Sequence, residues 1–197
     1  MKTLDALRRS LTDKTVLVAA PGPSLKAVHD AQRRQIDVVI GCNLAVEKIK
    51  AEWWLVVDDP GRIRDESRKA RYLAIDQKLP LIAPMTSRGW NRPFYAFRPV
   101  DPFSTSDLRM GTKRADAPQD PPDLPCFAGV PFAAACAAFV MGAKQVILAG
   151  VDYHGTVHDR PEQLQRITES FVLLRRWCRE NRRELVQGSR DSLLQFV

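Results

Sequence analysis

Short apolar runs alternate along the chain with longer segments whose apolar residues recur every three or four positions. Such runs are typical of buried strands, and such periodic segments are typical of amphipathic helices. The strands expected on this basis cover 15–20, 36–41, 53–57, 79–83 and 145–149, with an edge strand at 184–187. The expected helices cover 4–11, 24–34, 43–49, 61–74, 129–141, 161–181 and 189–196. The alternation predicts an α/β fold with a doubly wound, mostly parallel sheet.

The pattern breaks down between residues 84 and 125, where prolines, aromatic residues and polar residues follow no regular period. An irregular stretch of this length inside a compact domain is usually functional or disordered. We therefore expect one Rossmann-like domain over 1–197 with an irregular insertion at 84–125. The insertion, with a β-hairpin around 94–97, would form a lid over the site.

Composition places the chain among globular proteins, with 197 residues, 45% of them hydrophobic and 27% charged. No stretch reaches the roughly 20 apolar residues that span a bilayer. The first nine residues lack the apolar core of a signal peptide, so we expect a cytoplasmic protein. The four cysteines have no paired C-x-x-C spacing and are expected to be buried free thiols.

The formal net charge of +7 raises the question of a nucleic-acid partner. Much of the excess lies in arginine-rich segments at 62–71 and 166–183, where interleaved acidic residues are typical of a solvated helix face. No recognised nucleic-acid-binding motif accompanies the charge, so nucleic acid is not the expected partner. A basic surface also attracts an anionic nucleotide-linked substrate or an acidic glycan.

The most informative segment is the loop Pro21-Gly22-Pro23-Ser24, which interrupts the first long apolar run. Neither proline can continue a strand ladder, Gly22 permits close approach of backbone or ligand, and Ser24 is a good N-cap. A strand end that feeds a helix N-terminus suits a phosphate or carboxylate. An ordinary strand-to-helix corner explains the same residues equally well, and both interpretations stay open here.

Other polar residues also follow predicted strands, and parallel strands bring their carboxyl ends to one edge, where ligands bind. Asp152 could accept hydrogen bonds from ribose or sugar hydroxyls; a helix cap or an ordinary loop carboxylate is the alternative, and we favour the ligand role. Asn43 could bind a ligand, cap the next helix, or do both. Asp58 and Asp59 could bind a metal or hydroxyl groups, but Asp-Asp-Pro is also a common turn sequence, and we favour the turn.

His154 and His158 lie in the loop after the Asp152 strand. An imidazole, whose unperturbed pKa is about 6.5, can act as a general base near neutral pH. A general-base histidine and a histidine without a catalytic role are equally good interpretations at this point. Gly155 argues against a helix that would aim both rings at one metal ion, so no metal site is expected.

Several of these motifs resemble a known superfamily. The segments 22–26 (GPSLK), 42–43 (CN) and 129–153 look like the nucleotide-binding half of bacterial CMP-sialic acid transferases. The last segment also resembles the related archaeal-type hydroxymethylpterin diphosphokinases. The similarity runs from about residue 15 to residue 153 and is weak through the insertion. Pro21 stands where the transferases have asparagine, and residues 127–128 replace a hydroxyl pair.

The resemblance implies a glycosyltransferase that moves a sugar from a nucleotide-linked donor, such as a CMP-sugar, to an acceptor hydroxyl. His158 would be the general base and Asp152 the second catalytic residue. The residues expected at the donor are Gly22, Pro23, Ser24, Asn43, Asp59, Gly129, Gly150 and Tyr153. No tightly bound cofactor is expected.

Two other functions remain alternatives. The first is a diphosphokinase that requires Mg²⁺, with Asp58, Asp59 or Asp152 as ligands. The second is a catalytically degenerate nucleotide-binding module of bacterial or phage origin, which the departures at Pro21 and at residues 127–128 favour. The sugar, the acceptor and assembly into a homo-oligomer stay open.

Overall fold

The computed structural model describes residues 2–75, 79–101, 108, 110–112, 121–126, 128–153, 160–190 and 192–194. Its strands are β1 (Lys2–Thr3), β2 (Thr15–Ala19), β3 (Val38–Cys42), β4 (Trp53–Leu55), β5 (Leu81–Pro84), β6 (Tyr95–Val100), β7 (Asp123–Pro125), β8 (Gln145–Ala149) and β9 (Glu184–Gln187). Its α-helices are α1 (Leu25–Gln32), α2 (Glu66–Ala74), α3 (Val130–Val140) and α4 (Pro161–Glu180). Three 3₁₀ helices complete it: η1 (Leu4–Leu7), η2 (Asn43–Glu47) and η3 (Pro60–Arg62).

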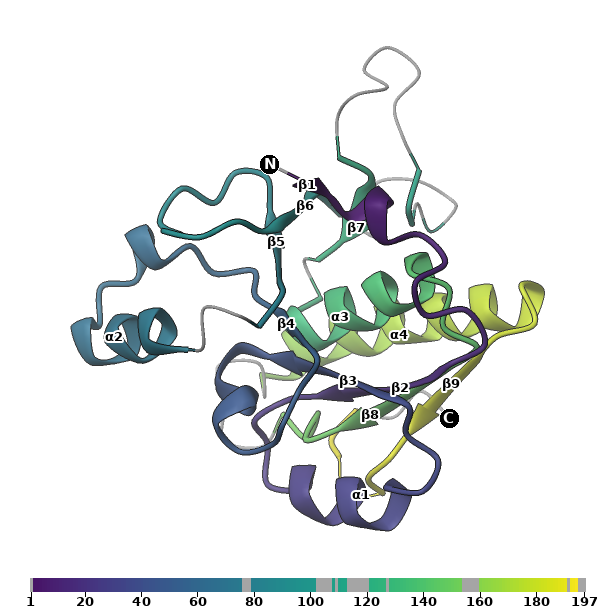
Figure 1. Ribbon diagram of the computed structural model, residues 1–197. Helices are drawn as coiled ribbons and strands as arrows, with labels where there is room; N and C mark the ends of the chain where they lie inside the picture. The colour runs from purple at the N-terminus through teal and green to yellow at the C-terminus, as the bar shows by residue number, and fades with distance from the viewer. Residues whose placement is uncertain are drawn as a thin grey trace.

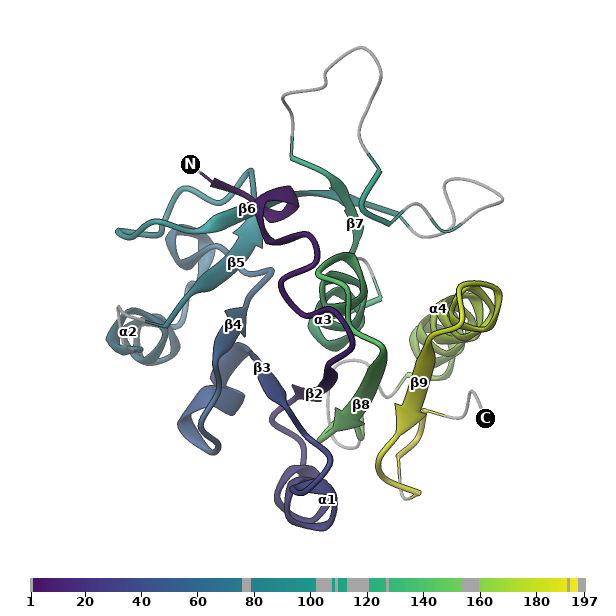
Figure 2. The same ribbon diagram turned by 45° about the vertical axis from the view of Figure 1, so that its right-hand side comes forward.

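The strands form one sheet in the order β1-β6-β5-β4-β3-β2-β8-β9, and β7 also pairs with β6. Every pairing between the described strands is parallel. Helices α3 and α4 cover one face of the sheet, and α1 and α2 cover the other (Figures 1 and 2). Helices on both faces of a parallel sheet define the doubly wound α/β fold, so the predicted fold class is confirmed.

The side chains of each strand divide between the two faces, as the period of two requires. In β3, Ile40 packs with α3 and α4, whereas its neighbour Val39 packs with α1. In β4, Leu55 joins the α3 side and Trp54 packs against α2 with Tyr72. Near-continuous apolar runs therefore mark strands that are buried on both faces.

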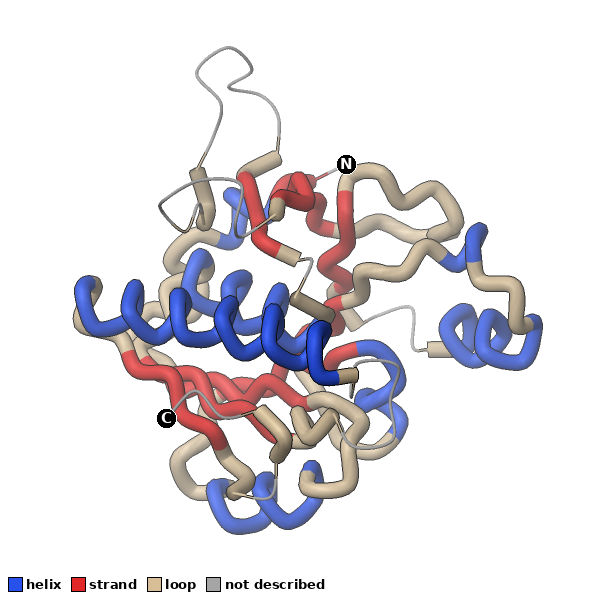
Figure 3. The backbone as a smooth tube through the Cα atoms, turned by 180° about the vertical axis from the view of Figure 1, so that it is seen from behind, coloured by secondary structure: helices blue, strands red, loops and turns tan. Residues whose placement is uncertain are grey.

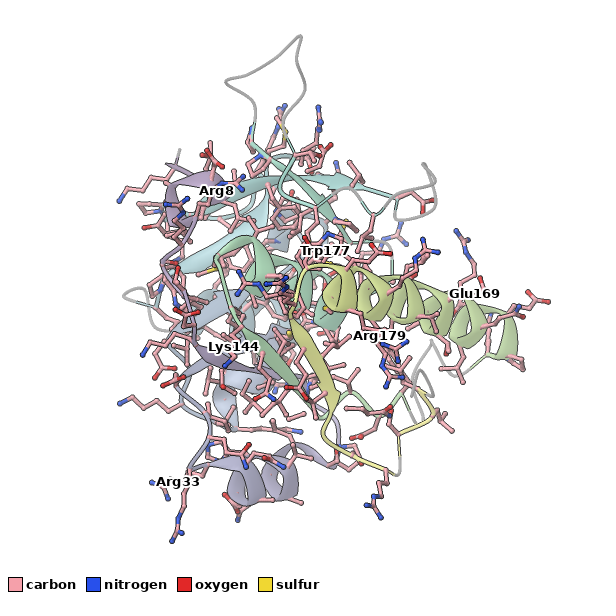
Figure 4. All side chains as sticks on the ribbon, turned by 90° about the vertical axis from the view of Figure 1, so that its right-hand side faces the viewer. Arg8, Arg33, Lys144, Glu169, Trp177 and Arg179 are labelled. Carbon is pink, nitrogen blue, oxygen red and sulfur yellow. The ribbon has the colours of Figure 1, made fainter. Side chains whose placement is uncertain are left out.

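Helix α3 is the central helix of its layer, and residues 132–140 are all buried. Its alanines allow close packing on the sheet, and α4 then lies beside it (Figure 3). Phe132 meets Phe171 of α4 edge-to-face, and Phe139 meets Trp177, which is labelled in Figure 4. Among the described residues no helix is both long and apolar enough to cross a membrane.

The insertion contributes to the sheet, which the sequence did not indicate. Strand β6 pairs in parallel with β5, with β1 and with β7. The expected hairpin around 94–97 is therefore wrong, because a hairpin joins antiparallel strands. The ion pair between Arg98 and the buried Asp123 ties β6 to β7. Much of the expected lid, at 102–107, 109 and 113–120, lies outside the described residues.

Two expected terminal helices differ in the structure. Only η1 of the segment 4–11 is helical, because the positive φ angles of Arg9 (68°) and Asp13 (62°) belong to turns. The described residues of 189–196 form no helix, since Ser192 donates its hydroxyl to the Val151 carbonyl and the Leu193 N–H bonds the Asp152 carbonyl. These contacts hold the C-terminal segment against the loop after β8.

The cysteines are buried free thiols, as expected from their spacing. Burial raises the pKa of Cys178 to about 12, and burial together with the charge of Asp101 raises the pKa of Cys126 to about 12. Neither thiol forms an appreciable amount of thiolate near neutral pH, so neither is a nucleophile in this structure.

Candidate functional site

The strand order reverses between β2 and β8. From β2 the chain moves outward through β3, β4, β5 and β6, and it then returns to the opposite side of β2 through β8 and β9. Ligands of doubly wound sheets bind outside the carboxyl ends of the strands at such a reversal. The loops at this point are residues 20–24 and 150–153, which the sequence analysis singled out.

Two glycines allow these loops to touch. The Gly22 N–H donates to the Gly150 carbonyl over 3.0 Å. A Cβ on Gly22 would lie 2.3 Å from that oxygen, and a Cβ on Gly150 would lie 2.1 Å from the Ala20 carbonyl. Gly150 also has a φ of +68°. The backbone of the loop at 150 therefore fills the position that a side chain of residue 22 would occupy. This part of the loop at 21–24 is a structural corner.

Ser24 and Asp152 continue the contact between the loops. The Ser24 N–H donates to Oδ2 of Asp152 over 2.9 Å, and its hydroxyl donates to Oδ1 over 2.6 Å. The Gly150 N–H donates to the Ser24 hydroxyl oxygen over 3.2 Å. Asp152 is only 2% exposed. We call Gly22, Ser24, Gly150 and Asp152 the clasp.

The clasp corrects the expected role of Ser24. Ser24 has helical φ and ψ angles, and its side chain makes no capping hydrogen bond within α1. The Asp152 carboxylate instead places its negative charge at the N-terminus of α1, where the helix dipole favours it. The contacts of Asp152 therefore fit the helix-cap interpretation, because both of its carboxylate oxygens accept hydrogen bonds from Ser24 at the start of α1.

A cavity of about 340 Å³ adjoins the clasp on the α1 side, and we call it the lysine cavity. Its lining residues are Gly22, Pro23, Leu25, Lys26, His29, Lys48 and Ile49. Lys48 donates its ammonium to the Pro21 carbonyl over 2.6 Å, which holds the charge at the corner. Lys26 has no ion-pair partner within the described chain. The sequence analysis named neither lysine as a site residue, although Lys26 lies two residues after Ser24 in the segment 22–26.

Asn43 begins η2 directly after β3, in the left-handed conformation with a φ of 50°. Asparagine tolerates this conformation better than most residues. The Asn43 carbonyl accepts the indole N–H of Trp54 over 2.7 Å. The side-chain Oδ1 is buried and has no hydrogen-bond partner among the described residues. Asn43 does not cap η2, so its expected capping role is wrong and its ligand role stays a prediction.

Gly129 and Tyr153 meet at the same edge of the sheet, on the α3 side. Gly129 precedes α3 with a φ of 97°, and Tyr153 follows β8 with a φ of 61°. The Tyr153 hydroxyl lies 3.5 Å from the point that a Cβ of Gly129 would occupy. Burial, with a smaller contribution from nearby Cys42, raises the pKa of Tyr153 well above its ordinary value. Tyr153 therefore stays neutral and can serve as a hydrogen-bonding group.

Asp59 binds backbone rather than open space. Its carboxylate accepts the N–H groups of Gly61 (3.0 Å), Arg88 (3.1 Å) and Gly89 (2.7 Å). Partial burial opposes ionisation, but these three donors and the nearby Arg62 outweigh it and lower the pKa of Asp59. The turn interpretation is confirmed, and the structure gives no support to Asp59 as a donor-binding residue.

The acidic residues proposed for Mg²⁺ do not converge. Asp58 and Asp59 follow β4 whereas Asp152 follows β8, three strand spacings or roughly 14 Å away. Asp58 pairs with Arg68 over 2.6 Å. The described ranges contain no group of three His, Cys, Asp or Glu side chains that could hold a metal ion. The expected base His158, with His154, lies outside the described residues.

No family model, curated protein or solved structure matches the chain.

Proposed function

We propose that the protein binds a nucleotide-linked donor at the reversal between β2 and β8 and transfers the linked sugar to an acceptor hydroxyl. The observation that carries this proposal is the lysine cavity at the N-terminus of α1. The ammonium groups of Lys26 and Lys48 favour phosphate there. The clasp supports the proposal because it fixes the start of α1 relative to β8.

The nucleoside would lie along the same edge of the sheet. Among the described residues, Asn43 has a buried acceptor without a hydrogen-bond donor, and leaving such a group unsatisfied costs about 1–3 kcal/mol. A ligand hydroxyl or amino group would satisfy it. Gly129 and Tyr153 border the same edge on the α3 side. The resemblance of segments 22–26, 42–43 and 129–153 to CMP-sialic acid transferases supports the same placement.

The reaction would be a displacement at the anomeric carbon of the sugar. The acceptor oxygen would form a bond to that carbon as its bond to the phosphate oxygen breaks, and the nucleotide would leave with the bonding electrons. His158 would take the proton of the acceptor hydroxyl as general base. Asp152 is reassigned as a positioning residue, because its carboxylate holds Ser24.

The diphosphokinase alternative receives less support. It requires carboxylates that share Mg²⁺, and Asp58, Asp59 and Asp152 are each held by protein donors at separated strand ends. Full activity in the presence of a chelator would exclude it.

The proposal is tested by thermal shift with CMP, CDP, UDP, GDP, ATP and their sugar conjugates. A ligand at 100 times its Kd stabilises the native state by about 2.7 kcal/mol. We expect stabilisation by at least one nucleotide, and a smaller shift in the double variant Lys26→Gln/Lys48→Gln. The charge-matched control is Arg33→Gln/Lys144→Gln, whose exposed side chains are labelled in Figure 4. No shift with any nucleotide, or equal shifts in both double variants, would overturn the proposal.

A further inference from the structure

A second cavity, of about 410 Å³, lies at the carboxyl ends of β4 and β5. Its lining residues are Val57, Asp58, Asp59, Arg62, Ile63, Arg64, Asp65, Arg68, Thr86 and Ser87, and we call it the arginine cavity. Strand β4 lies two strand spacings from β2, which is roughly 10 Å. The arginine cavity is therefore separate from the lysine cavity but lies along the same edge of the sheet.

The floor of the arginine cavity is fixed by backbone contacts. Asp59 joins the turn at 60–61 to the loop at 88–89 through three N–H groups. The two segments approach so closely that a Cβ on Gly89 would lie 2.2 Å from the Gly61 nitrogen. This contact sets Arg62, on one segment, relative to Ser87, on the other.

The carboxylates of the cavity are all committed to protein partners. Asp58 pairs with Arg68, whose guanidinium also lies over the ring of Tyr72. Asp59 holds the floor, as described above. Asp65 accepts the Arg68 N–H over 3.0 Å as the N-cap of α2. Asp58 is paired with a cation, whereas Asp59 and Asp65 accept backbone N–H groups, and the charge of Arg62 acts on Asp59.

Arg62 and Arg64 differ from these residues because no described residue holds their guanidinium groups. Both are exposed, and neither guanidinium has a hydrogen-bond or ion-pair partner in the described part of the chain. Ile63, between them, is extended and packs into the α2-side core. Arg62 and Arg64 therefore flank a residue that is anchored in the core, and both line the cavity.

We propose that the arginine cavity binds an oxyanion, a phosphate or a carboxylate, through the guanidinium groups of Arg62 and Arg64. A guanidinium offers a planar pair of donors that matches either anion. Ser87, which is 7% exposed and lines the cavity, adds a hydroxyl at its wall. The anion would be the acidic group of the acceptor. That last assignment rests on the proposed function, whereas anion binding itself does not.

The test is a titration of the full chain, followed by amide chemical shifts in ¹H–¹⁵N spectra at fixed pH and ionic strength. The probes are inorganic phosphate and acetate, with chloride as the reference salt. We expect saturable shifts at Arg62, Arg64 and Ser87. The variant Arg62→Gln/Arg64→Gln should lose at least tenfold in affinity at these amides, and Arg62→Lys/Arg64→Lys should lose less.

Two comparisons separate the possible outcomes. Lys26→Gln/Lys48→Gln should leave the shifts at the arginine cavity unchanged, and Arg33→Gln/Lys144→Gln should leave all shifts unchanged. Saturation at Arg62 and Arg64 in a protein that binds no nucleotide would support the anion site while the proposed donor site fails. Shifts that do not saturate, or that persist in Arg62→Gln/Arg64→Gln, would overturn the inference. A response to phosphate but not acetate, or the reverse, identifies the acidic group.

Discussion

The clasp and the arginine cavity lie along one edge of the sheet but use their polar groups in opposite ways. In the clasp, each oxygen of the buried Asp152 carboxylate meets a donor from Ser24. In the arginine cavity the carboxylates also have protein partners, but Arg62 and Arg64 are exposed and form no ion pair within the described part of the chain. Polar residues at this edge of the sheet therefore fall into two groups. Some hold the loops in place, and others remain available for a ligand.

We expect the largest loss of stability from a substitution that disrupts the backbone contact of the clasp. Gly150→Ala places a Cβ 2.1 Å from the Ala20 carbonyl at a φ of +68°. We expect the free energy of unfolding to fall by about 2–4 kcal/mol in urea titrations. The matched control is Gly61→Ala, whose Cβ would make an ordinary 3.4 Å contact. Equal stabilities for the two variants would show that the loops do not meet as described.

The next effect separates structural from ligand-binding roles for Asp152. Asp152→Ala leaves two Ser24 donors without a charged acceptor and should cost about 2–3 kcal/mol in the free energy of unfolding. Asp152→Asn keeps one acceptor oxygen and should cost less. Asp152→Asn, which still accepts from Ser24, should retain most of the wild-type thermal shift with nucleotide. If Asp152→Asn had normal stability but no longer responded to nucleotide, Asp152 would be a ligand-binding residue.

A smaller effect concerns pH and the floor of the arginine cavity. The pKa of Asp59 is lowered in the folded state, so its contribution to stability is present above its unfolded pKa of about 3.9 and is lost as pH falls through the folded value. Unfolding measured from pH 6 downward should therefore show less acid sensitivity in Asp59→Asn than in the wild type. Parallel curves would contradict the three N–H contacts.

The smallest expected change in stability is at Asn43. Asn43→Gly removes a buried acceptor without a partner and relieves the left-handed backbone, so the melting temperature should stay close to that of the wild type. Nucleotide-induced stabilisation should nevertheless decrease. A large loss of stability without ligand would show that Asn43 is a structural residue.

The main architecture could be predicted because buried strands and amphipathic helices leave local patterns. Strands β2, β3 and β8 follow unbroken apolar runs, and α4 follows its own apolar stripe. Strands β1, β6 and β7 could not be predicted, because β1 has only two residues and β6 and β7 lie in a segment without a regular period. Leu4, Leu7 and Leu11 are buried, as the apolar spacing of the expected helix at 4–11 requires, but this spacing did not reveal the turn at Arg9.

The candidate site was predictable in location but not in detail. The strand ends that carry Gly22, Asn43 and Asp152 do lie at neighbouring strands of one edge, as parallel pairing requires. The exchange between Ser24 and Asp152 could not be foreseen, because it joins residues 128 positions apart. Lys48 was missed for the same reason. The position of the Lys48 ammonium depends on its hydrogen bond to the Pro21 carbonyl, which its neighbours in sequence do not indicate.

The most direct test of the central claim is a nucleotide titration of the full chain followed through backbone amide shifts. The nucleotide that gives the largest thermal shift is added to saturation at constant ionic strength. We expect the largest changes at Lys26, Lys48 and Asn43, with little change at the amino end of β8 near Lys144. Changes confined to other surfaces, or none at saturating nucleotide, would contradict a donor site at the reversal between β2 and β8.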